Sequence, residues 1–497
     1  MSKLSILQDL SFGERVAEEE SRELAKYFFQ TEQWRRIFAG EIDVVYGSKG
    51  SGKSAIYSVL LTKESELFDN QIILIPAEKP RGTPVFRELI EDPPPNESQF
   101  MGLWKLYILS LIGNAFREYS ISNNHAREVI RTLEESGLLE REKDLSSRLR
   151  GAYDYIKRIF NPESIGVEIS VDANTGVSAF TPKITFREPN STQVKNGYIS
   201  IDKLFEKSDL ALKEINFNIW AILDRLDVAF AETEQLEENA LRALFKVYLD
   251  LLGFDNIRLK IFIRTDIWRR ITEIGFREAS HITRHVTISW DNGSLLNLII
   301  RRILKNGMIC NEYNVDPIEV LNSVEKQKEL FYKIFPDQIE VGPNKSKTFE
   351  WMLSRTGDAT KATAPRELIH LLNSSREVQL RKLELGEAEP IGQALFSRIA
   401  IKEALVDVSK TRLEQTIYAE YPNMKQILEK LEGEKTQQNP QALAKIWQIS
   451  EPEAITIAYE LVKIGFFEER GQRGTPEFWV PFLYRDALKM IQGTAEY

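Results

Sequence analysis

The sequence predicts an α/β fold of the P-loop type: an open parallel sheet with helices on both faces, then a helical lid and a C-terminal winged-helix-like domain. A glycine-rich loop at residues 47–54 joins an apolar strand pattern to a helix pattern. Strand and helix patterns then alternate to about residue 290, which favours parallel strands with crossover helices. Helix patterns continue from residue 295 and end in a helix–turn–helix–hairpin order.

The glycine-rich loop fits the phosphate-binding pattern of Gly, four residues, then Gly-Lys-Ser. Its residues are Gly47, Ser48, Lys49, Gly50, Ser51, Gly52, Lys53 and Ser54. The glycines let the main chain turn tightly, so that its N–H groups can surround a polyphosphate at a helix N-terminus. We expect Lys53 to reach the β and γ phosphates and the Ser54 hydroxyl to ligate Mg²⁺. The loop therefore predicts ATP with Mg²⁺ as ligands, although the sequence does not distinguish ATP from GTP.

A second chemical landmark follows the continuous apolar run at residues 219–223, which predicts a strand covered on both faces. The run ends at Asp224, and a carboxylate at the C-terminal end of a buried parallel strand suits a Mg²⁺ ligand. We predict that Asp224 and Ser54 hold the metal, with Asp224 on the strand adjacent to the loop strand. The alternative is that Asp224 caps a turn at the strand end.

Three more strands complete the predicted sheet, at residues 71–75, 259–263 and 286–290. The second of these ends in Arg264 and Thr265, whose polar side chains could contact the γ phosphate or the attacking water. A helix is then expected to carry four arginines, namely Arg269, Arg270, Arg277 and Arg284.

Residues 1–40 are predicted to form a helical lead-in packed on the core at residues 41–293. Its apolar stripe consists of Ala17, Leu24, Ala25, Phe28 and Phe29. An alternative is that Phe12-Gly13 and this helix wall the adenine pocket. An insertion at about residues 98–200 is expected to begin with a helix capped by Ser98, whose apolar face packs in the core. It also contains a predicted β-hairpin at residues 164–187, with no readable function.

Composition limits the classes of protein that fit. The chain has 497 residues, of which 42% are hydrophobic, and a net charge of -9, which gives no sign of general nucleic-acid affinity. No apolar run reaches the ~18 residues that a membrane span needs, and no signal-peptide pattern is present. Cys310 is the only cysteine and the four histidines do not cluster. We therefore expect a cytoplasmic protein without a membrane partner or a structural metal.

The C-terminal half divides into a predicted lid at residues 294–375, a helical connector at 376–435 and a winged-helix-like domain at 436–497. Near the end of the lid, Pro365 begins a helix and places Arg366 on its first turn. Asn439-Pro440 signals another helix start, and Ser450 with Glu453 fits a capping box for the next helix. Two strand patterns around the turn at residues 471–476 complete the winged-helix order.

With these motifs the chain resembles the bacterial P-loop ATPases of the AAA+ and STAND supergroup. It looks most like origin-recognition-like ATPases with a C-terminal winged helix, many of which belong to antiphage defence modules. The resemblance covers most of the chain from about residue 10. It implies that residues 47–54 are the Walker A loop, that Asp224 is the Walker B acid, and that Arg264 and Thr265 take the sensor 1 place. It also implies Arg366 as the sensor 2 arginine, and Arg284, or alternatively Arg277, as the arginine finger.

One position departs from the family pattern. Arg225 stands where such ATPases usually carry a glutamate after the Walker B aspartate. The next acid is Asp227, which is the sequence-based candidate for the base that must reach the attacking water. Slow hydrolysis, or nucleotide binding used only as a switch, is the alternative.

The sequence thus favours an oligomeric ATP-driven switch that acts on an effector protein in a defence-type module. The alternative is a nucleotide-regulated DNA-binding protein, because winged helices can place a helix in the major groove. Binding of nucleic acid is not favoured, because the second helix of the domain carries three acids, Glu451, Glu453 and Glu460, but a single basic residue, Lys463. A P-loop kinase is a third class, but those enzymes are usually shorter and lack such a lid.

Overall fold

The computed structural model describes residues 2–14, 24, 28, 31–78, 96–139, 144–160, 183–226, 234–273, 275–360, 364–472 and 475–495. The chain divides into two compact units. The core unit comprises Gln30–Gly47 and Lys53–Ile288. The C-terminal unit comprises Met1–Phe29, Ser48–Gly52 and Ser289–Tyr497. The first residues therefore group with the C-terminal unit, which differs from the sequence-based placement of residues 1–40 on the core.

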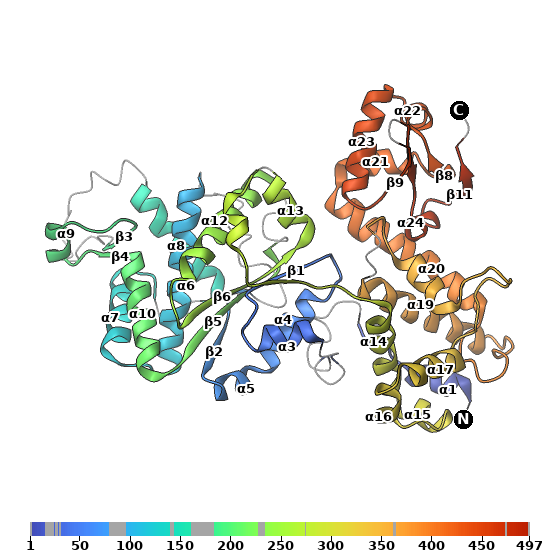
Figure 1. Cartoon of the computed structure of the whole chain (residues 1–497), viewed down its shortest axis with the longest axis horizontal. Coiled ribbons are helices and arrows are strands. Elements are labelled where there is room, and N and C mark those ends of the chain that lie inside the picture. The colour runs from blue at the N-terminus through green and yellow to red at the C-terminus, as the bar shows by residue number, and fades with distance from the viewer. Residues whose placement is uncertain are drawn as a thin grey trace. The chain divides into compact units, whose positions relative to one another are not determined.

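A five-stranded parallel sheet forms the centre of the core unit (Figure 1). Its order is β2–β5–β6–β1–β7. The strands are β1 Val44–Gly47, β2 Ile72–Pro76, β5 Asn218–Leu223, β6 Ile257–Arg264 and β7 His285–Thr287. The open parallel sheet is confirmed. The expectation that Asp224 follows a strand adjacent to β1 is wrong, because β6 pairs with both β1 and β5 and lies between them.

Helices cover both faces of this sheet, and further helices form an insertion. The helical elements of the core unit are α3 Glu32–Phe38, α4 Lys53–Thr62, α5 Glu64–Asp69, α6 Glu97–Glu118, α7 Asn124–Glu135, α8 Leu145–Phe160, α9 Ser191–Lys195, α10 Ile201–Ile215, α12 Glu234–Leu251, α13 Thr265–Glu273 and the 3-10 turn η3 Arg277–His281. Successive strand residues point to opposite faces. Ile261 and Ile263 therefore join the buried cluster of α6 and α12, while Phe262 meets Tyr57 of α4 with ring centroids 6.1 Å apart.

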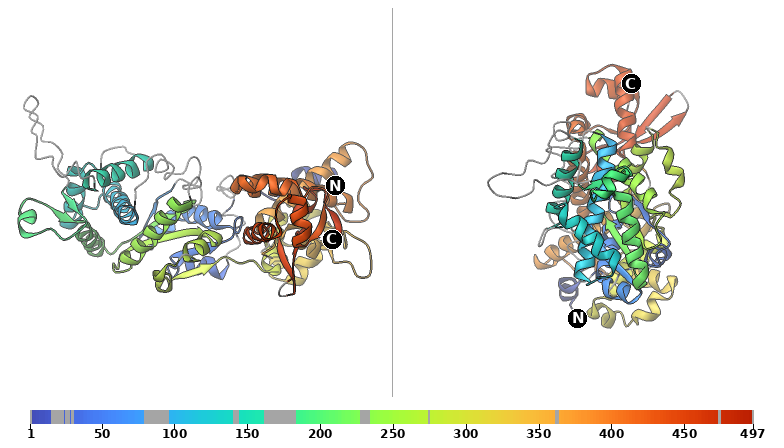
Figure 2. Two further views of the ribbon diagram at one scale, coloured as in Figure 1. Left: turned by 90° about the horizontal axis from the view of Figure 1, so that it is seen from above. Right: turned by 90° about the vertical axis from the view of Figure 1, so that its left-hand side faces the viewer.

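The insertion between β2 and β5 is mainly a helical bundle. Helices α6, α7, α8 and α10 pack on one another at one end of the core unit (Figures 1 and 2). The apolar stripe of α6 is buried as expected, but Asn96 rather than Ser98 caps the helix, accepting a hydrogen bond from the Gln99 N–H. Most of the predicted hairpin lies outside the described residues. Its last part forms β3 Ile184–Thr185, which pairs in parallel with β4 Ile199–Ser200.

The arginine-rich segment after β6 is not the single helix that the sequence predicted. Helix α13 ends at Glu273, and Gly275 adopts a positive φ of 93°, a conformation that commonly stops a helix. Arg277 consequently lies on η3, and Arg284 lies in the segment that leads into β7.

The C-terminal unit is largely helical. Its helices are α1 Lys3–Asp9, α14 Asn292–Leu304, α15 Gly307–Glu312, α16 Pro317–Leu321, α17 Val324–Ile334, α18 Thr348–Thr356, α19 Pro365–Glu384, α20 Arg398–Arg412, η4 Leu413–Tyr418, η5 Pro422–Met424, α21 Lys425–Glu429, α22 Pro440–Trp447, α23 Glu451–Lys463 and α24 Phe482–Arg485. Helix α19 runs without a break across residue 375, where the sequence placed the boundary between lid and connector.

The N-terminal segment is tied to this unit by main-chain hydrogen bonds. Arg376 of α19 donates to the carbonyl oxygens of Leu7 and Gln8, each at 2.7 Å. Arg302 donates to the Phe12 carbonyl, and Asn373 donates to the Gly13 carbonyl at 2.7 Å. These bonds place the Phe12-Gly13 pair in the C-terminal unit; its predicted part in an adenine pocket stays a prediction.

The part of the chain that begins at Lys435, the first residue of β8, forms the predicted winged-helix order. Asn439 caps α22, and Ser450 with Glu453 forms the expected capping box of α23. The wing is the antiparallel pair of β9 Glu468–Gln472 and β10 Thr475–Trp479. Two strands that the sequence did not indicate, β8 Lys435–Gln438 and β11 Ile491–Thr494, complete a sheet of order β11–β8–β10–β9.

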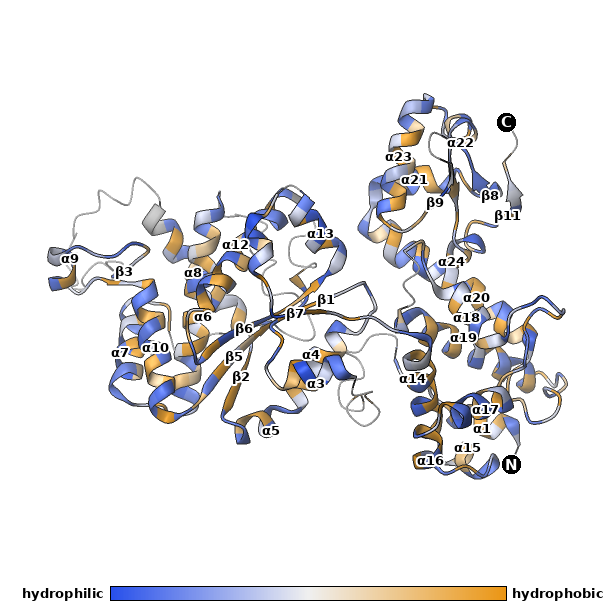
Figure 3. Cartoon of the chain, in the orientation of Figure 1, coloured by the Kyte–Doolittle hydropathy of each residue, from blue (hydrophilic) through white to orange (hydrophobic). Residues whose placement is uncertain are grey.

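Hydropathy follows burial in both units. In Figure 3, β2, β5 and α6 carry mostly hydrophobic residues, whereas the more exposed α7 alternates between hydrophobic and hydrophilic ones. Within the described part of the chain, no helix combines the length and apolar character needed to cross a bilayer.

A buried ion cluster lies where the chain enters β1. The fully buried Asp43 accepts hydrogen bonds from Arg284 Nε at 2.5 Å and from Lys260 Nζ at 3.3 Å. Lys260 Nζ also donates to the Ile42 carbonyl at 2.6 Å and lies 4.0 Å from the centroid of the Trp220 ring. Burial lowers the pKa of Lys260 to about 8, although Asp43 acts in the opposite direction. One carboxylate thus pairs with two basic side chains at this edge of the sheet.

We expect Asp43→Asn to lower the free energy of unfolding by about 3 kcal/mol, because it leaves a buried lysine and a partly buried arginine without their counter-charge. Denaturant titration of the purified protein measures this loss. Glu41→Gln is the control, since the Glu41 carboxylate pairs with Arg36 at the surface, where an ion pair contributes under about 1 kcal/mol. Equal losses in the two variants would contradict the assigned role of Asp43.

Candidate phosphate-binding site

The glycine-rich loop makes the strand-to-helix turn that the sequence predicts. Strand β1 ends at Gly47 and α4 begins at Lys53. Gly50 and Gly52 have φ angles of 79° and 101°, which glycine adopts without the strain that a Cβ would add. The Ser51 N–H donates to the Ser48 carbonyl at 3.2 Å. The loop therefore delivers the chain to the N-terminus of α4, where the helix dipole favours an anion.

Polar groups of the loop fit a polyphosphate. Lys53 Nζ donates to the Gly47 carbonyl at 3.0 Å, so the ammonium group lies across the loop. Ser51 Oγ is buried and has no hydrogen-bond partner among the described residues. Ser54 lies half-buried on the first turn of α4. A cation, a buried unsatisfied hydroxyl and a glycine turn are the features that a bound phosphate would use.

The loop tip, Ser48–Gly52, packs within the C-terminal unit. A Cβ placed on Gly50 would lie 2.9 Å from the Arg366 Cβ and 3.3 Å from the Ala364 Cβ. Trp290 Nε1 donates to the Ser51 carbonyl at 2.8 Å, and Lys49 forms an ion pair with Glu420. The structure thus brings the predicted sensor 2 arginine, Arg366, to the tip of the predicted Walker A loop.

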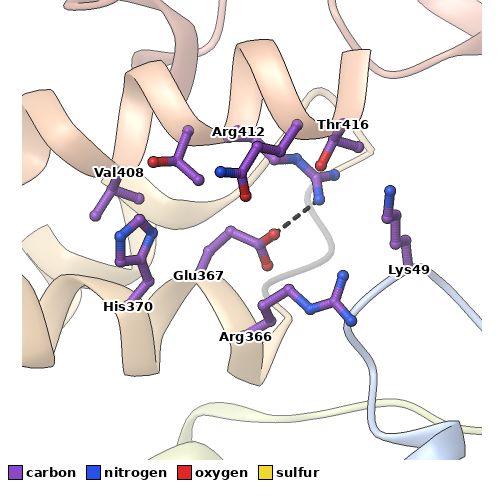
Figure 4. A pocket seen from close by; sticks show the side chains of 9 residues that line it. Lys49, Arg366, Glu367, His370, Val408, Arg412 and Thr416 are labelled. Carbon is purple, nitrogen blue, oxygen red and sulfur yellow. Dashed lines mark hydrogen bonds and ion pairs between the residues drawn. The ribbon is translucent and has the colours of Figure 1, made fainter. Parts of the chain in front are cut away.

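Lys49 and Arg366 also line a pocket beside the loop tip (Figure 4). The other lining residues are Glu367, His370, Val408, Thr411, Arg412, Gln415 and Thr416. Arg412 donates to Glu367 at 2.7 Å. Burial acts to lower the pKa of Arg412, but Glu367, Tyr484 and Asp358 together raise it above its usual value. The pocket therefore contains the basic side chains of Lys49, Arg366 and Arg412, of which Lys49 pairs with Glu420 and Arg412 pairs with Glu367.

In the core unit, Asp224 lies close to the helix that carries Lys53 and Ser54. Asp224 directly follows β5, and only 3% of its surface is exposed to solvent. Burial raises the pKa of Tyr57 on α4, and the carboxylates of Asp224 and Glu78 raise it further. Since Tyr57 follows Lys53 by one helical turn, both carboxylates are near the start of α4. The pairing of Asp224 with Ser54 at a metal stays a prediction.

Glu78 is a buried acid that the sequence analysis did not single out. It follows β2 by two residues and is fully buried. The only sequence feature that could have indicated it is its place just after the apolar run of residues 72–75. Such a position is the same as that of Asp224 on β5, but the strand pairing is needed to show that the two ends meet.

The sensor 1 candidates lie at the end of β6. In the pairing of β1 with β6, Gly47 stands opposite Arg264, and Thr265 begins α13. The Arg264 guanidinium donates two hydrogen bonds to the Asp266 carboxylate, from Nε at 3.1 Å and from Nη2 at 2.6 Å.

The residues after Asp224 include the sequence-based candidate for the base. Arg225, which follows Asp224 directly, has a positive φ of 57°. Asp227, the predicted base, lies outside the described residues.

The two arginine-finger candidates differ in their surroundings. Arg284 is bound to Asp43 and to the Gly40 carbonyl, at the edge where β1 and β7 begin. The glycine-rich loop follows the opposite end of β1, so Arg284 lies at the far end of that strand from the loop of its own chain. Arg277 lies exposed on η3.

Among the described residues, no group of three or more His, Cys, Asp or Glu side chains is placed to hold a metal ion. A site of Mg²⁺ type does not require one, because this ion usually takes one or two protein ligands and completes its shell with phosphate oxygens and water.

No protein-family model and no curated protein matches this chain. Similar solved structures include the ORC1 protein of Aeropyrum pernix in complex with DNA, at 12% identity and a TM-score of 0.35, covering 95% of this chain and 91% of that one. A Walker-type ATPase of Pyrococcus abyssi has 10% identity and a TM-score of 0.40, with coverages of 93% and 96%. The ORC2 protein of Aeropyrum pernix, in ADPNP–ADP complexes, has 11% identity and a TM-score of 0.31, with coverages of 95% and 94%.

We expect Gly50→Ala to lower the thermal unfolding midpoint more than Gly386→Ala. The two glycines have nearly equal φ angles, 79° and 80°, so the strain of a positive φ is the same, about 1–3 kcal/mol. A Cβ at Gly386 meets nothing within 4 Å, whereas one at Gly50 meets the Cβ of Arg366. Scanning calorimetry compares the two variants with the wild type. Equal shifts would argue against close packing between the loop tip and α19.

Proposed function

We propose that this protein is an ATP-binding and ATP-hydrolysing molecular switch of the AAA+ type. The observation that carries the proposal is the phosphate loop of residues 47–54, set between a buried strand and a helix, with the buried Asp224 beside that helix. Ser54 and Asp224 would hold Mg²⁺, which neutralises phosphate charge when bound. Lys53 would exchange its bond to the Gly47 carbonyl for one to the β and γ phosphates.

Arg366 supports the switch part of the proposal. It contacts Gly50 at the loop tip and lies on the first turn of α19, a helix of 20 residues in the C-terminal unit. We propose that Arg366 binds the γ phosphate and loses that contact after hydrolysis. A ligand shifts a conformational equilibrium only by binding its states unequally, and the γ phosphate supplies that difference. The helices joined to α19 would then respond to the nucleotide.

We also propose self-assembly, with an arginine of one subunit acting at the loop of the next. Arg277 is the better placed of the two candidates, since it is exposed while Arg284 is held by Asp43. We further propose that the protein belongs to a defence-type module and acts on an effector protein. Both proposals rest on the family resemblance of its motifs.

DNA binding through the winged helix is the second candidate function. Its wing offers Arg470, but this guanidinium stacks on Trp479 with 3.9 Å to the ring centroid and pairs with Glu468 at 3.1 Å. The exposed face of α23 begins with two acids, Glu451 and Glu453. These features favour a protein partner. A salt-dependent mobility shift with duplex DNA would instead support the second candidate.

Purified wild-type protein with Mg²⁺ should bind and hydrolyse ATP, and Lys53→Ala should lose both properties, because the loop lysine contacts the phosphates directly. Isothermal titration and phosphate release measure the two properties. Lys63→Ala is the control: this lysine follows α4 and pairs with Glu66 at the surface, so both properties should be kept. A wild type with neither affinity nor turnover would exclude the proposed function.

If Arg277 acts on a neighbouring subunit, Arg277→Ala and Lys53→Ala should each be inactive alone and should recover part of the activity when mixed. A mixed interface pairs an intact loop with an intact arginine, as a head-to-tail ring requires. Phosphate release by the mixture, with mass measurement in ATP analogue, ADP and no nucleotide, provides the test. Full activity of Arg277→Ala alone would show that this arginine has no such role.

A further inference from the structure

The described chain lacks a glutamate in the place after Asp224, where the resemblance leads one to expect the base. Arg225 occupies that position and its main chain turns away through a positive φ. Hydrolysis of a phosphoanhydride by water is assisted by a group that orients the water and takes its proton. The question is therefore which other carboxylate the fold brings to this edge of the sheet.

Strand pairing places Glu78 beside Asp224. In the parallel pair of β2 and β5, Pro76 stands opposite Ile222, and the Ala77 N–H donates to the Ile222 carbonyl at 2.9 Å. Glu78 is two residues beyond Pro76, and Asp224 is two residues beyond Ile222. Since the register of a parallel pair advances equally on both strands, the two acids leave the sheet side by side.

Two buried tyrosines hold the main chain at Glu78. Tyr57 of α4 donates to the Glu78 carbonyl at 2.5 Å, and Tyr107 of α6 donates to the Ala77 carbonyl at 2.7 Å. The Glu78 carboxylate also raises the pKa of both phenols, after the larger effect of their burial. The main chain that carries the acid is therefore held from both faces of the sheet, and a catalytic group needs such a rigid support.

We propose that Glu78 is the general base for the nucleoside triphosphate bound at residues 47–54, an inference that rests on the proposed function. As the oxygen of water bonds to the γ phosphorus, the bond to the bridging oxygen breaks and the diphosphate leaves. One proton of the water passes to the Glu78 carboxylate and is afterwards released to solvent. Asp224 keeps the separate role of metal ligand, so the two neighbouring carboxylates have different functions: one accepts the proton and the other binds the metal.

The test compares nucleotide affinity with turnover in Glu78→Gln, which keeps the size of the side chain but accepts no proton. We expect the affinity for ATP to stay within about threefold of wild type and the hydrolysis rate to fall by at least ~100-fold. Glu66→Gln is the control, since this exposed acid lies outside the site and should leave both values unchanged. Wild-type turnover in Glu78→Gln, together with its loss in Asp227→Asn, would overturn the inference in favour of Asp227.

If Glu78→Gln does not fold, Glu78→Asp decides the matter. It keeps a buried carboxylate but withdraws it by one methylene, so we expect the rate to fall at least ~10-fold at nearly unchanged affinity. An unchanged rate would overturn the inference. Failure of the proposed function is recognised separately, because then the wild type itself would show neither nucleotide affinity nor turnover.

Discussion

The turn by which the chain leaves β1 and enters α4 is the constraint on which the rest of the site depends. Gly50 and Gly52 take positive φ angles there, so the main chain can reverse within a few residues and start a helix at Lys53. Several candidate site residues of the core unit lie at the edge of the sheet where this turn occurs. The ends of β2, β5 and β6 bring Glu78, Asp224 and Arg264 to that edge because the sheet is parallel throughout.

The same loop contributes to both units of the chain. Gly47 and Lys53 belong to the core unit, whereas the tip between them packs within the C-terminal unit, against Arg366 and Trp290. A nucleotide whose phosphates touched the main chain of this loop would contact a segment that packs on Arg366, which is the physical basis of the proposed switch.

Charge is distributed unequally between the two edges of the sheet. At the edge where β1 begins, the Asp43 carboxylate forms ion pairs with Lys260 and Arg284, so the acid and its partners stabilise the fold. At the opposite edge, Asp224 and Glu78 are buried together near the start of α4. Burying two acids side by side costs free energy unless cations lie near them, and the Mg²⁺ proposed at Asp224 would supply positive charge there.

Local features of the chain could be predicted from the sequence alone. The glycine-rich turn, the strands around it, the parallel sheet, and the capped helices and hairpin of the winged-helix-like domain depend on periodicity, turn residues and caps within a few positions. The candidate loop residues and Asp224 were found in the same way, whereas the helix break at Gly275 was missed.

Other features depend on contacts between segments that are far apart in the sequence, and only the tertiary structure shows them. Three features join residues 38 to 241 positions apart, which no local pattern encodes: the place of β6 between β1 and β5, the neighbouring positions of Glu78 and Asp224, and the ion pair of Arg284 with Asp43. The packing of residues 3–13 on α19 belongs to the same class. Propensity and periodicity act between near neighbours, while strand order and burial of charge are settled by the whole packed chain.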